Sequence, residues 1–191
     1  MTPPRVIGLY SSVPQSGKTT IAYELQQRGY ICIPFASPLK RMVGVFLGSL
    51  GYSHQMISTF LFEKKEQRIP ELGVSARHLM QTLGSEWGRE CISPSVWIDA
   101  WRCAAQRQLD GGLNVVVDDC RFSNEYQVIK DLGGEMWRVK RTDTEVAPPP
   151  THMSEGNLDS HSFDRIFLND STVSALHNQL AIELALQPAL T

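Results

Sequence analysis

The sequence has few cysteines, no long hydrophobic segment and almost no excess of charge of either sign. Its four cysteines are scattered, with no CxxC pair and no histidine at metal-binding spacing. This argues against a disulfide scaffold or a zinc site and predicts reduced thiols, as in a cytosolic protein. Cys120 lies beside other polar candidates, but no base that could activate its thiol is evident. The cysteines are Cys32, Cys91, Cys103 and Cys120.

Membrane and nucleic-acid binding are also disfavoured. No apolar run reaches the ~20 residues that span a bilayer, and the opening MTPPRVIGLYSS lacks the apolar core of a signal peptide. The 18 basic and 20 acidic residues give a formal charge of −2, which provides no electrostatic basis for binding long nucleic acid. We therefore expect a cytosolic protein, in which any positive charge for phosphate binding is local.

Strand-like and helix-like segments alternate along the 191 residues, a length typical of one domain. Such alternation predicts an α/β fold in three layers, a parallel sheet flanked by helices, with ligands at the carboxyl ends of the strands. The expected strands are 5–10, 30–34, 113–117, 135–140 and 165–168, and the expected helices 17–27, 37–50, 54–62, 75–90, 96–109, 123–132 and 172–186.

Two stretches depart from this alternation. Residues 35–110 are mainly helical and would form an added region beside the sheet. Its first helix is expected to be capped by Ser37, with Pro38 in the first turn. Residues 141–163 contain three consecutive prolines and are expected to form a loop or lid.

A short loop joins the first strand to the first helix and has the spacing of a phosphate-binding loop. Its backbone N–H groups can wrap phosphates, and the positive end of the following helix adds to the attraction. Ser12 stands where glycine is usual and must tolerate a similarly tight turn. Lys18 would reach the outer phosphates and the Thr19 hydroxyl would bind Mg²⁺. The expected ATP-binding loop residues are Ser12, Val13, Pro14, Gln15, Ser16, Gly17, Lys18, Thr19 and Thr20.

Two carboxylates leave the end of the most apolar strand, in VVVDDCRFSNE at 115–125. A carboxylate there can hold Mg²⁺ directly or through water. Asp118 and Asp119 should point to opposite sides, so that one faces the metal and the other anchors backbone. The alternative is that both only cap the next helix. Arg121 offers a fork of donors suited to phosphate.

The helical region carries weaker candidates. Arg77, Gln81 and Gly84 share one helix face, where Arg77 could bind a phosphate and Gln81 a base, although such faces are commonly only solvated. Leu79, Leu83 and Trp87 are expected to pack on the core. Trp97 and Trp101 follow on the next helix; each is either a core residue or a platform for a nucleobase, and the pattern favours the core.

Basic residues also lie in the region of the expected lid. Arg138, Lys140 and Arg141 could neutralise charge in a phosphoryl transfer, or could belong to a solvated turn.

Together these segments resemble the deoxynucleoside monophosphate kinases of tailed bacteriophages, a branch of the P-loop monophosphate kinases. The combination of FA-x-PLK, RxLxQxLG-x-E and D-x-RF-x-NE is far more specific than the loop alone. The matching segments are SGKTT at 16–20, PFASPLKRMV at 34–43, ARHLMQTLGSEWGRE at 76–90, VWIDAW at 96–101, VVVDDCRFSNE at 115–125, THMSE at 151–155 and FDRIFLND at 163–170.

The resemblance implies a single P-loop kinase domain over 1–191 that transfers the γ-phosphoryl of ATP, with Mg²⁺, to a deoxynucleoside monophosphate. Residues 35–110 would bind the monophosphate and 141–163 would form the lid. Lys40 and Arg121 would contact phosphate, and Arg77, Gln81 and Trp97 would line the monophosphate pocket. Asp119 fits the D-x-R unit better than Asp118 does, and Lys18, Arg121 and Asp119 would be catalytic. The resemblance also implies ATP contacts from Arg138 and Arg141, a homodimer, and work in a bacterial host's cytosol.

Three other functions are alternatives to this one. A P-loop kinase of another small acceptor, such as dephospho-coenzyme A, would share the same loop. A nucleotide-controlled switch of the GTPase kind should carry D-x-x-G and N-K-x-D, whereas here the strands end in DDCR and NDST. A nucleic-acid end kinase is disfavoured because the sequence carries no basic surface signal.

Overall fold

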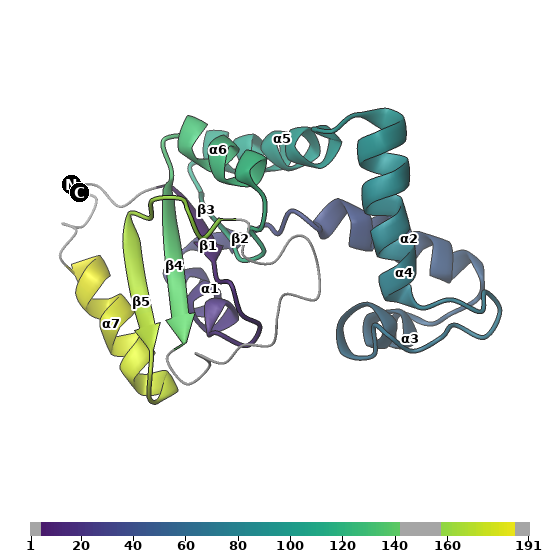
Figure 1. Ribbon diagram of the computed structural model, residues 1–191, viewed down its shortest axis with the longest axis horizontal. Helices are drawn as coiled ribbons and strands as arrows, with labels where there is room; N and C mark the ends of the chain where they lie inside the picture. Colours follow the sequence, from purple (N-terminus) through teal and green to yellow (C-terminus); the bar gives the residue numbers. More distant parts are fainter. Residues whose placement is uncertain (1–4, 142–157, 186–191) are drawn as a thin grey trace. The chain divides into compact units, whose positions relative to one another are not determined.

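The computed structural model describes residues 5–141 and 158–185 (Figure 1). Its strands are β1 Val6–Tyr10, β2 Tyr30–Cys32, β3 Asn114–Val117, β4 Glu135–Arg141 and β5 Arg165–Asn169. Its α-helices are α1 Lys18–Gln26, α2 Ser37–Ser49, α3 His54–Ser58, α4 Ala76–Thr82, α5 Val96–Asp110, α6 Ser123–Asp131 and α7 Val173–Ala185. Two further segments are π-helical, η1 Thr59–Glu63 and η2 Leu83–Ile92.

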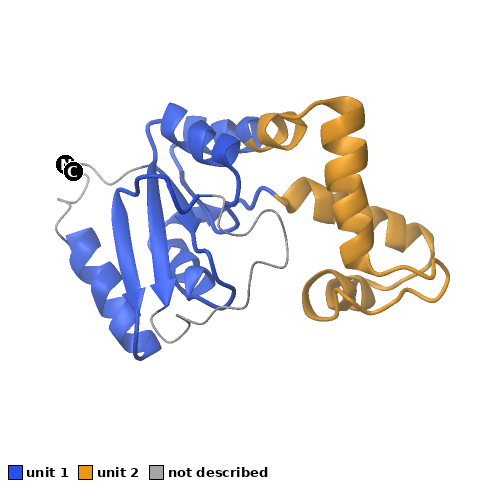
Figure 2. Ribbon diagram, viewed as in Figure 1, with its two compact units in different colours: residues 1–35, 102–191 blue, residues 36–101 orange. Residues whose placement is uncertain are grey.

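The chain divides into two compact units, coloured in Figure 2. The sheet unit comprises Met1–Phe35 and Arg102–Thr191, and the helical unit comprises Ala36–Trp101. Helix α5 begins in the helical unit and ends in the sheet unit.

The sheet unit is built on five parallel strands in the order β2-β3-β1-β4-β5. Strand β1 is buried along its whole length, because it lies in the middle of the sheet with helices on both faces (Figure 1). On one face α1 and α7 contribute to the main core, while Val128 and Ile129 of α6 are buried on the other. The predicted α/β fold, a parallel sheet flanked by helices, is therefore confirmed.

This topology places the polar ends of four strands at one edge. Because all the strands are parallel, the loop after β1, the aspartates after β3, and the last residues of β4 and β5 leave the sheet in the same direction. The residues concerned are 11–17, Asp118, Asp119, Arg141 and Asn169.

The helical unit has its own core. Val43 and Leu47 of α2 pack with Phe60 and Leu61 of η1, and with Ile69 and Ala76. Leu79 and Leu83 pack against this cluster as predicted, but Trp87 is 42% exposed, so its predicted place in the core is wrong. The prediction of Ser37 as a cap is also wrong: α2 begins at Ser37, its N-cap position is Ala36 without a side-chain cap, and Pro38 lies in the first turn.

The two π-helical segments explain why Trp87 leaves the expected face. The predicted helices 54–62 and 75–90 each begin as α-helix and widen into η1 and η2. A π-helix adds a residue to each hydrogen-bonded turn. The i, i+4, i+8 spacing that would align Leu79, Leu83 and Trp87 on an α-helix therefore no longer holds beyond Thr82.

Most of the predicted lid, including THMSE and the three prolines, lies outside the described residues. In the described part of the chain, no helix combines the length and the hydropathy needed to cross a membrane.

Candidate functional site

The loop after β1 combines uncommon backbone geometry with a buried interior. Gln15 has φ 54°, and among the described residues it is the only non-glycine with positive φ, while Gly17 has φ 103°. Ser12 was expected to take the special conformation, but the positive φ angles lie three and five residues later. Successive N–H groups in turns of this kind form a concavity for anions.

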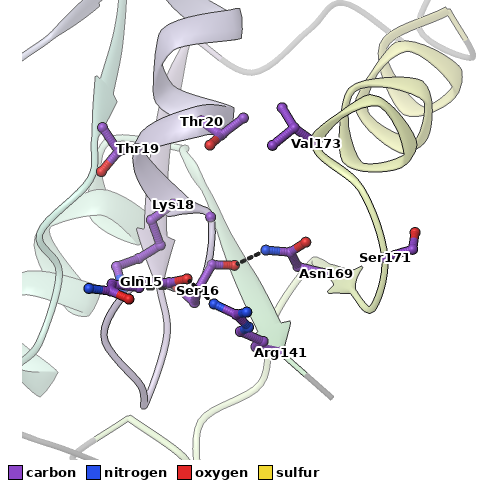
Figure 3. Close-up of a pocket in the computed structure, with 10 residues that line it drawn as sticks. Gln15, Ser16, Lys18, Thr19, Thr20, Arg141, Asn169, Ser171 and Val173 are labelled. Atoms are coloured by element: carbon purple, nitrogen blue, oxygen red, sulfur yellow. Dashed lines mark hydrogen bonds between the residues drawn. The ribbon is translucent and has the colours of Figure 1, made fainter. Parts of the chain in front are cut away.

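The loop borders a pocket of about 380 Å³ (Figure 3). Of the predicted ATP-binding residues, Gln15 to Thr20 and Arg141 line it. The pocket also involves Asn169, Ser171 and Val173, which sequence reasoning did not single out. Their position after a late strand was the available signal, since ligands of such sheets gather at the carboxyl ends of strands. Ser12, Val13, Pro14 and Arg138 are not among the lining residues.

Lys18 is the electrostatic centre of this edge of the sheet. Burial, together with the nearby positive charge of Arg121, lowers its pKa to about 8, while the charges of Asp118 and Asp119 act in the opposite direction. Its ammonium group donates to Ser16 Oγ at 3.3 Å. The structure thus brings together the predicted lysine, arginine and both aspartates.

The two aspartates differ in what they contact. Asp119 Oδ1 accepts the backbone N–H of Phe35 at 2.8 Å and so ties the end of β3 to the segment that follows β2. Asp118 is partly exposed at the end of the same strand. Capping of α6 is done by Glu125, which accepts from the N–H groups of Arg121 at 2.7 Å and Phe122 at 3.1 Å. Burial raises the pKa of the Cys120 thiol, which stays protonated.

Arg138 has a different surrounding from the one predicted. Its guanidinium pairs with Asp159 at 2.5 Å and lies over the rings of Tyr10 and Phe163, with centroid distances of 5.7 and 5.6 Å. The Tyr10 hydroxyl donates to the same carboxylate at 3.1 Å, and burial, with Asp159, raises its pKa to about 12. Arg138 therefore fastens residues 158–163 to β1 and β4, and its predicted contact with ATP has no support from the pocket.

The helical unit holds the four residues predicted to bind the monophosphate there. The Lys40 ammonium lies 4.7 Å from the centre of the Phe62 ring. Arg77 forms an ion pair with Glu66, and Gln81 is exposed on the same helix. Trp97 is buried and its indole N–H donates to the Gly84 carbonyl at 2.8 Å. The burial of Trp97 and Trp101 confirms that both are core residues; contact of Trp97 with substrate stays a prediction.

Of the two buried glycines of η2, Gly88 makes room for the Trp97 ring. A Cβ at Gly88 would lie 2.5 to 2.7 Å from three atoms of the indole, whereas one at Gly84 would meet only Leu39 Cδ1 at 3.3 Å. The indole is rigid, so it cannot yield as a flexible side chain would.

Gly88→Ala is expected to lower the free energy of unfolding by about 2 kcal/mol, because overpacking forces Trp97 out of its site. Gly84→Ala is the matched control and should cost less than half as much, since Leu39 can shift. Urea unfolding followed by tryptophan fluorescence measures both. Equal costs for the two variants would contradict the tight fit of Gly88 against the indole.

Comparison with known proteins places this arrangement in context. A sequence model of deoxynucleotide monophosphate kinases matches residues 48–180. A protein of Acanthamoeba polyphaga mimivirus, named "Putative deoxynucleotide monophosphate kinase", is 28% identical over 180 residues, covering 86% of this chain and 89% of that protein.

Solved structures share the fold. TT1252 from Thermus thermophilus is similar with a TM-score of 0.54 and 17% identity, over 99% of this chain and 100% of that one. The dephospho-CoA kinase from Campylobacter jejuni gives a TM-score of 0.54 and 11% identity, over 95% of this chain and 96% of that one.

Proposed function

Since this chain belongs to the deoxynucleotide monophosphate kinase family, we propose that it transfers the γ-phosphoryl group of ATP to a deoxynucleoside monophosphate, giving the diphosphate and ADP. The observation that carries the proposal is the gathering of Lys18, Arg121 and two aspartates at a loop with anion-binding backbone geometry. We further propose that the enzyme is encoded by a bacteriophage and supplies precursors for its DNA synthesis.

The donor triphosphate would lie along residues 15–20. Lys18 would neutralise charge on the outer phosphates, and Arg121 would stabilise the equatorial oxygens as the phosphoryl group moves in line. The acceptor oxygen is already an anion near neutral pH, so no side chain is assigned as a general base. Catalysis would then rest on positioning and charge, which is typical of phosphoryl transfer.

A Mg²⁺ ion carried by the triphosphate would supply further charge neutralisation. Thr19, Asp118 and Asp119 are the groups that would hold it, directly or through water. Within residues 5–141 and 158–185, no cluster of three or more His, Cys, Asp or Glu side chains forms a metal cage. That fits an ion bound through one or two carboxylates and substrate phosphates, as Mg²⁺ commonly is.

The acceptor would be recognised by the helical unit. Lys40 and Arg77 supply positive charge for its phosphate, and the exposed amide of Gln81 can hydrogen-bond a base. Arg77 is paired with Glu66, so binding would exchange one carboxylate partner for the substrate phosphate. Which base is accepted depends on this pocket, and the homodimer implied by the resemblance stays a prediction.

The alternative acceptor is dephospho-coenzyme A, because one structural neighbour is a kinase for that compound. At 11% identity that likeness shows the fold alone, whereas the family match spans residues 48–180. The second alternative, a switch that binds nucleotide without phosphoryl transfer, would show no acceptor-dependent turnover.

A panel of acceptors tests the proposal. Purified protein with MgATP is offered each natural deoxynucleoside monophosphate, their hydroxymethylated forms and dephospho-coenzyme A, and ADP is measured with a control lacking acceptor. We expect ADP formation to rise at least a hundredfold with one or more of the monophosphates. Turnover with dephospho-coenzyme A alone would favour the first alternative, and nucleotide binding without any turnover would favour the switch.

A further inference from the structure

Two side chains from neighbouring strand ends donate hydrogen bonds to consecutive carbonyl groups of the phosphate loop. At the end of β4, Arg141 Nη1 donates to the Gln15 carbonyl at 3.2 Å. At the end of β5, Asn169 Nδ2 donates to the Ser16 carbonyl at 2.9 Å (Figure 3). The loop is thus held by two residues that are far from it in the sequence.

These bonds have a consequence for the loop's N–H groups. In a trans peptide the C=O and the following N–H point in opposite directions, because the peptide unit is planar. A Ser16 carbonyl directed at Asn169 therefore directs the Gly17 N–H away from Asn169. In the view of Figure 3, Asn169 lies on one side of Ser16 and the Lys18 side chain lies on the other. The Gly17 N–H thus points to the side of Lys18, where negative charge is attracted.

The peptide between Ser16 and Gly17 is closely packed on the Asn169 side. Ser16 is 1% exposed. A Cβ at Gly17 would lie 3.0 Å from Asn169 Nδ2 and 2.9 Å from Leu176 Cδ2. Gly17 also has φ 103°, and Gln15 has φ 54°, an uncommon angle for a residue with a side chain. Backbone of this kind persists only where the surroundings hold it in place.

We propose that Asn169 is a positioning residue for the phosphate loop, which through the Ser16 carbonyl keeps the Gly17 N–H directed at the phosphates of the donor. The proposal rests on the proposed function in that the loop binds ATP. Asn169 does not need to touch the nucleotide for this role. Its effect is to form the anion-binding geometry before the ligand arrives, so that less ordering is needed on binding.

Asn169 separates this role from direct contact better than Arg141 does. A guanidinium at this edge can itself attract phosphate, so an Arg141 variant would lose charge as well as the bond. The amide of Asn169 is neutral, and its replacement by Ala removes the donor without changing the charge. Asn169→Asp has nearly the same shape but cannot donate and places a carboxylate against the Ser16 carbonyl.

The first measurement is the Kd for MgATP by calorimetry. Asn169→Ala is expected to raise Kd about fivefold, the usual effect of one lost hydrogen bond, and Asn169→Asp at least thirtyfold. Asp170→Ala is the control for the neutral variant and should stay within twofold. Ser171→Asp brings the same negative charge to the pocket wall without reaching the Ser16 carbonyl. If Ser171→Asp weakens binding as much as Asn169→Asp does, charge alone explains the loss and the inference fails.

The second measurement reports on the loop itself. In ¹⁵N-labelled protein, saturating MgATP is expected to move the Gly17 amide resonance strongly in the wild type and less than half as far in Asn169→Ala. Without nucleotide, ¹⁵N relaxation should show a more mobile Gly17 amide in this variant than in the wild type. An unchanged order parameter overturns the inference even if the chain binds no nucleotide. Normal ATP binding by both proteins overturns it while leaving the proposed function intact.

Discussion

Lys18→Met is expected to lower kcat by ~10²–10³ while raising the temperature at which the protein unfolds. A charged donor placed at a developing charge typically contributes ~3–4 kcal/mol to the transition state. Methionine keeps the length and most of the volume of the side chain but cannot donate or carry charge. The variant should therefore fold and lose the group proposed to neutralise the outer phosphates.

The gain in stability follows from the cost of burying the charge. Burial and Arg121 lower the Lys18 pKa from 10.5 to about 8. The unfolded chain then binds the Lys18 proton more tightly, so this residue destabilises the fold below pH 8, and the cost disappears as the pH rises from about 8 to about 10.5. At pH 7 the cost is roughly 3 kcal/mol at 1.36 kcal/mol per pH unit. Methionine removes much of it.

Single-turnover kinetics test the expected loss of activity in Lys18→Met, and calorimetric unfolding of the same preparations tests the expected gain in stability. The Kd of the wild-type protein for MgATP should rise about tenfold per pH unit above pH 8, because Lys18 of the nucleotide-free protein loses its proton. This rise should be absent in Lys18→Met. Activity within threefold of the wild type would contradict the role of Lys18 in transfer. A variant less stable than the wild type at pH 7 would contradict the buried, costly charge.

The sheet and the position of the loop between β1 and α1 could be predicted because their signals are local. The apolar run 113–117 and the spacing of Gly17, Lys18 and Thr19 each lie within a few residues of sequence. The same alternation that gave the strand positions also put Asp118 and Asp119 at the edge where Lys18 lies. In this part of the chain the local sequence pattern and the overall topology favour the same structure, which is typical of sequences that fold to one state.

The contacts that complete the site could not be predicted, because they join residues distant in the chain. Asn169 contacts a carbonyl 153 residues away, and Asp119 an amide 84 residues away. Arg138 was assigned to ATP as a basic residue near the expected lid, but Asp159 and two aromatic rings engage it. Charge pattern alone does not show which arginine is already paired.

The change from α-helix to π-helix in two segments could not be predicted from the sequence either. Apolar spacing at 75–90 fits an α-helix until residue 82, where η2 begins; within η2, Gly88 packs on the Trp97 ring and the Gly84 carbonyl accepts its indole N–H. Two glycines four residues apart near a tryptophan are the only trace in the sequence. Because the turn widens after Thr82, α-helical periodicity placed Trp87 on the wrong face.

Replacing Glu125 is expected to have the second large effect, although sequence analysis assigned this residue no role. Glu125 is only 4% exposed, and its Oε2 accepts hydrogen bonds from the backbone N–H groups of both Arg121 and Phe122. A carboxylate at the first turn of α6 is also favoured by the helix dipole. This single oxygen thus fixes the backbone from which the Arg121 side chain extends.

Glu125→Ala is expected to lower the free energy of unfolding by about 3 kcal/mol, because two charge-assisted hydrogen bonds are lost and two amides lose a buried acceptor. Glu125→Gln keeps a neutral acceptor and should lose about half as much. The neighbouring Asn124→Ala, on the exposed side of the same turn, is the control and should change stability by less than ~0.5 kcal/mol. Urea unfolding at pH 7 measures all three.

The activity of Glu125→Ala separates fixing of Arg121 from simple stabilisation. Under conditions where the variant is fully folded, we expect kcat to fall at least tenfold, since Arg121 would no longer be held at the position where charge develops. The double variant with Arg121→Ala should then lose little more than Arg121→Ala alone, because both changes remove the same contribution. Losses that multiply would show that Glu125 supports the fold without acting through Arg121.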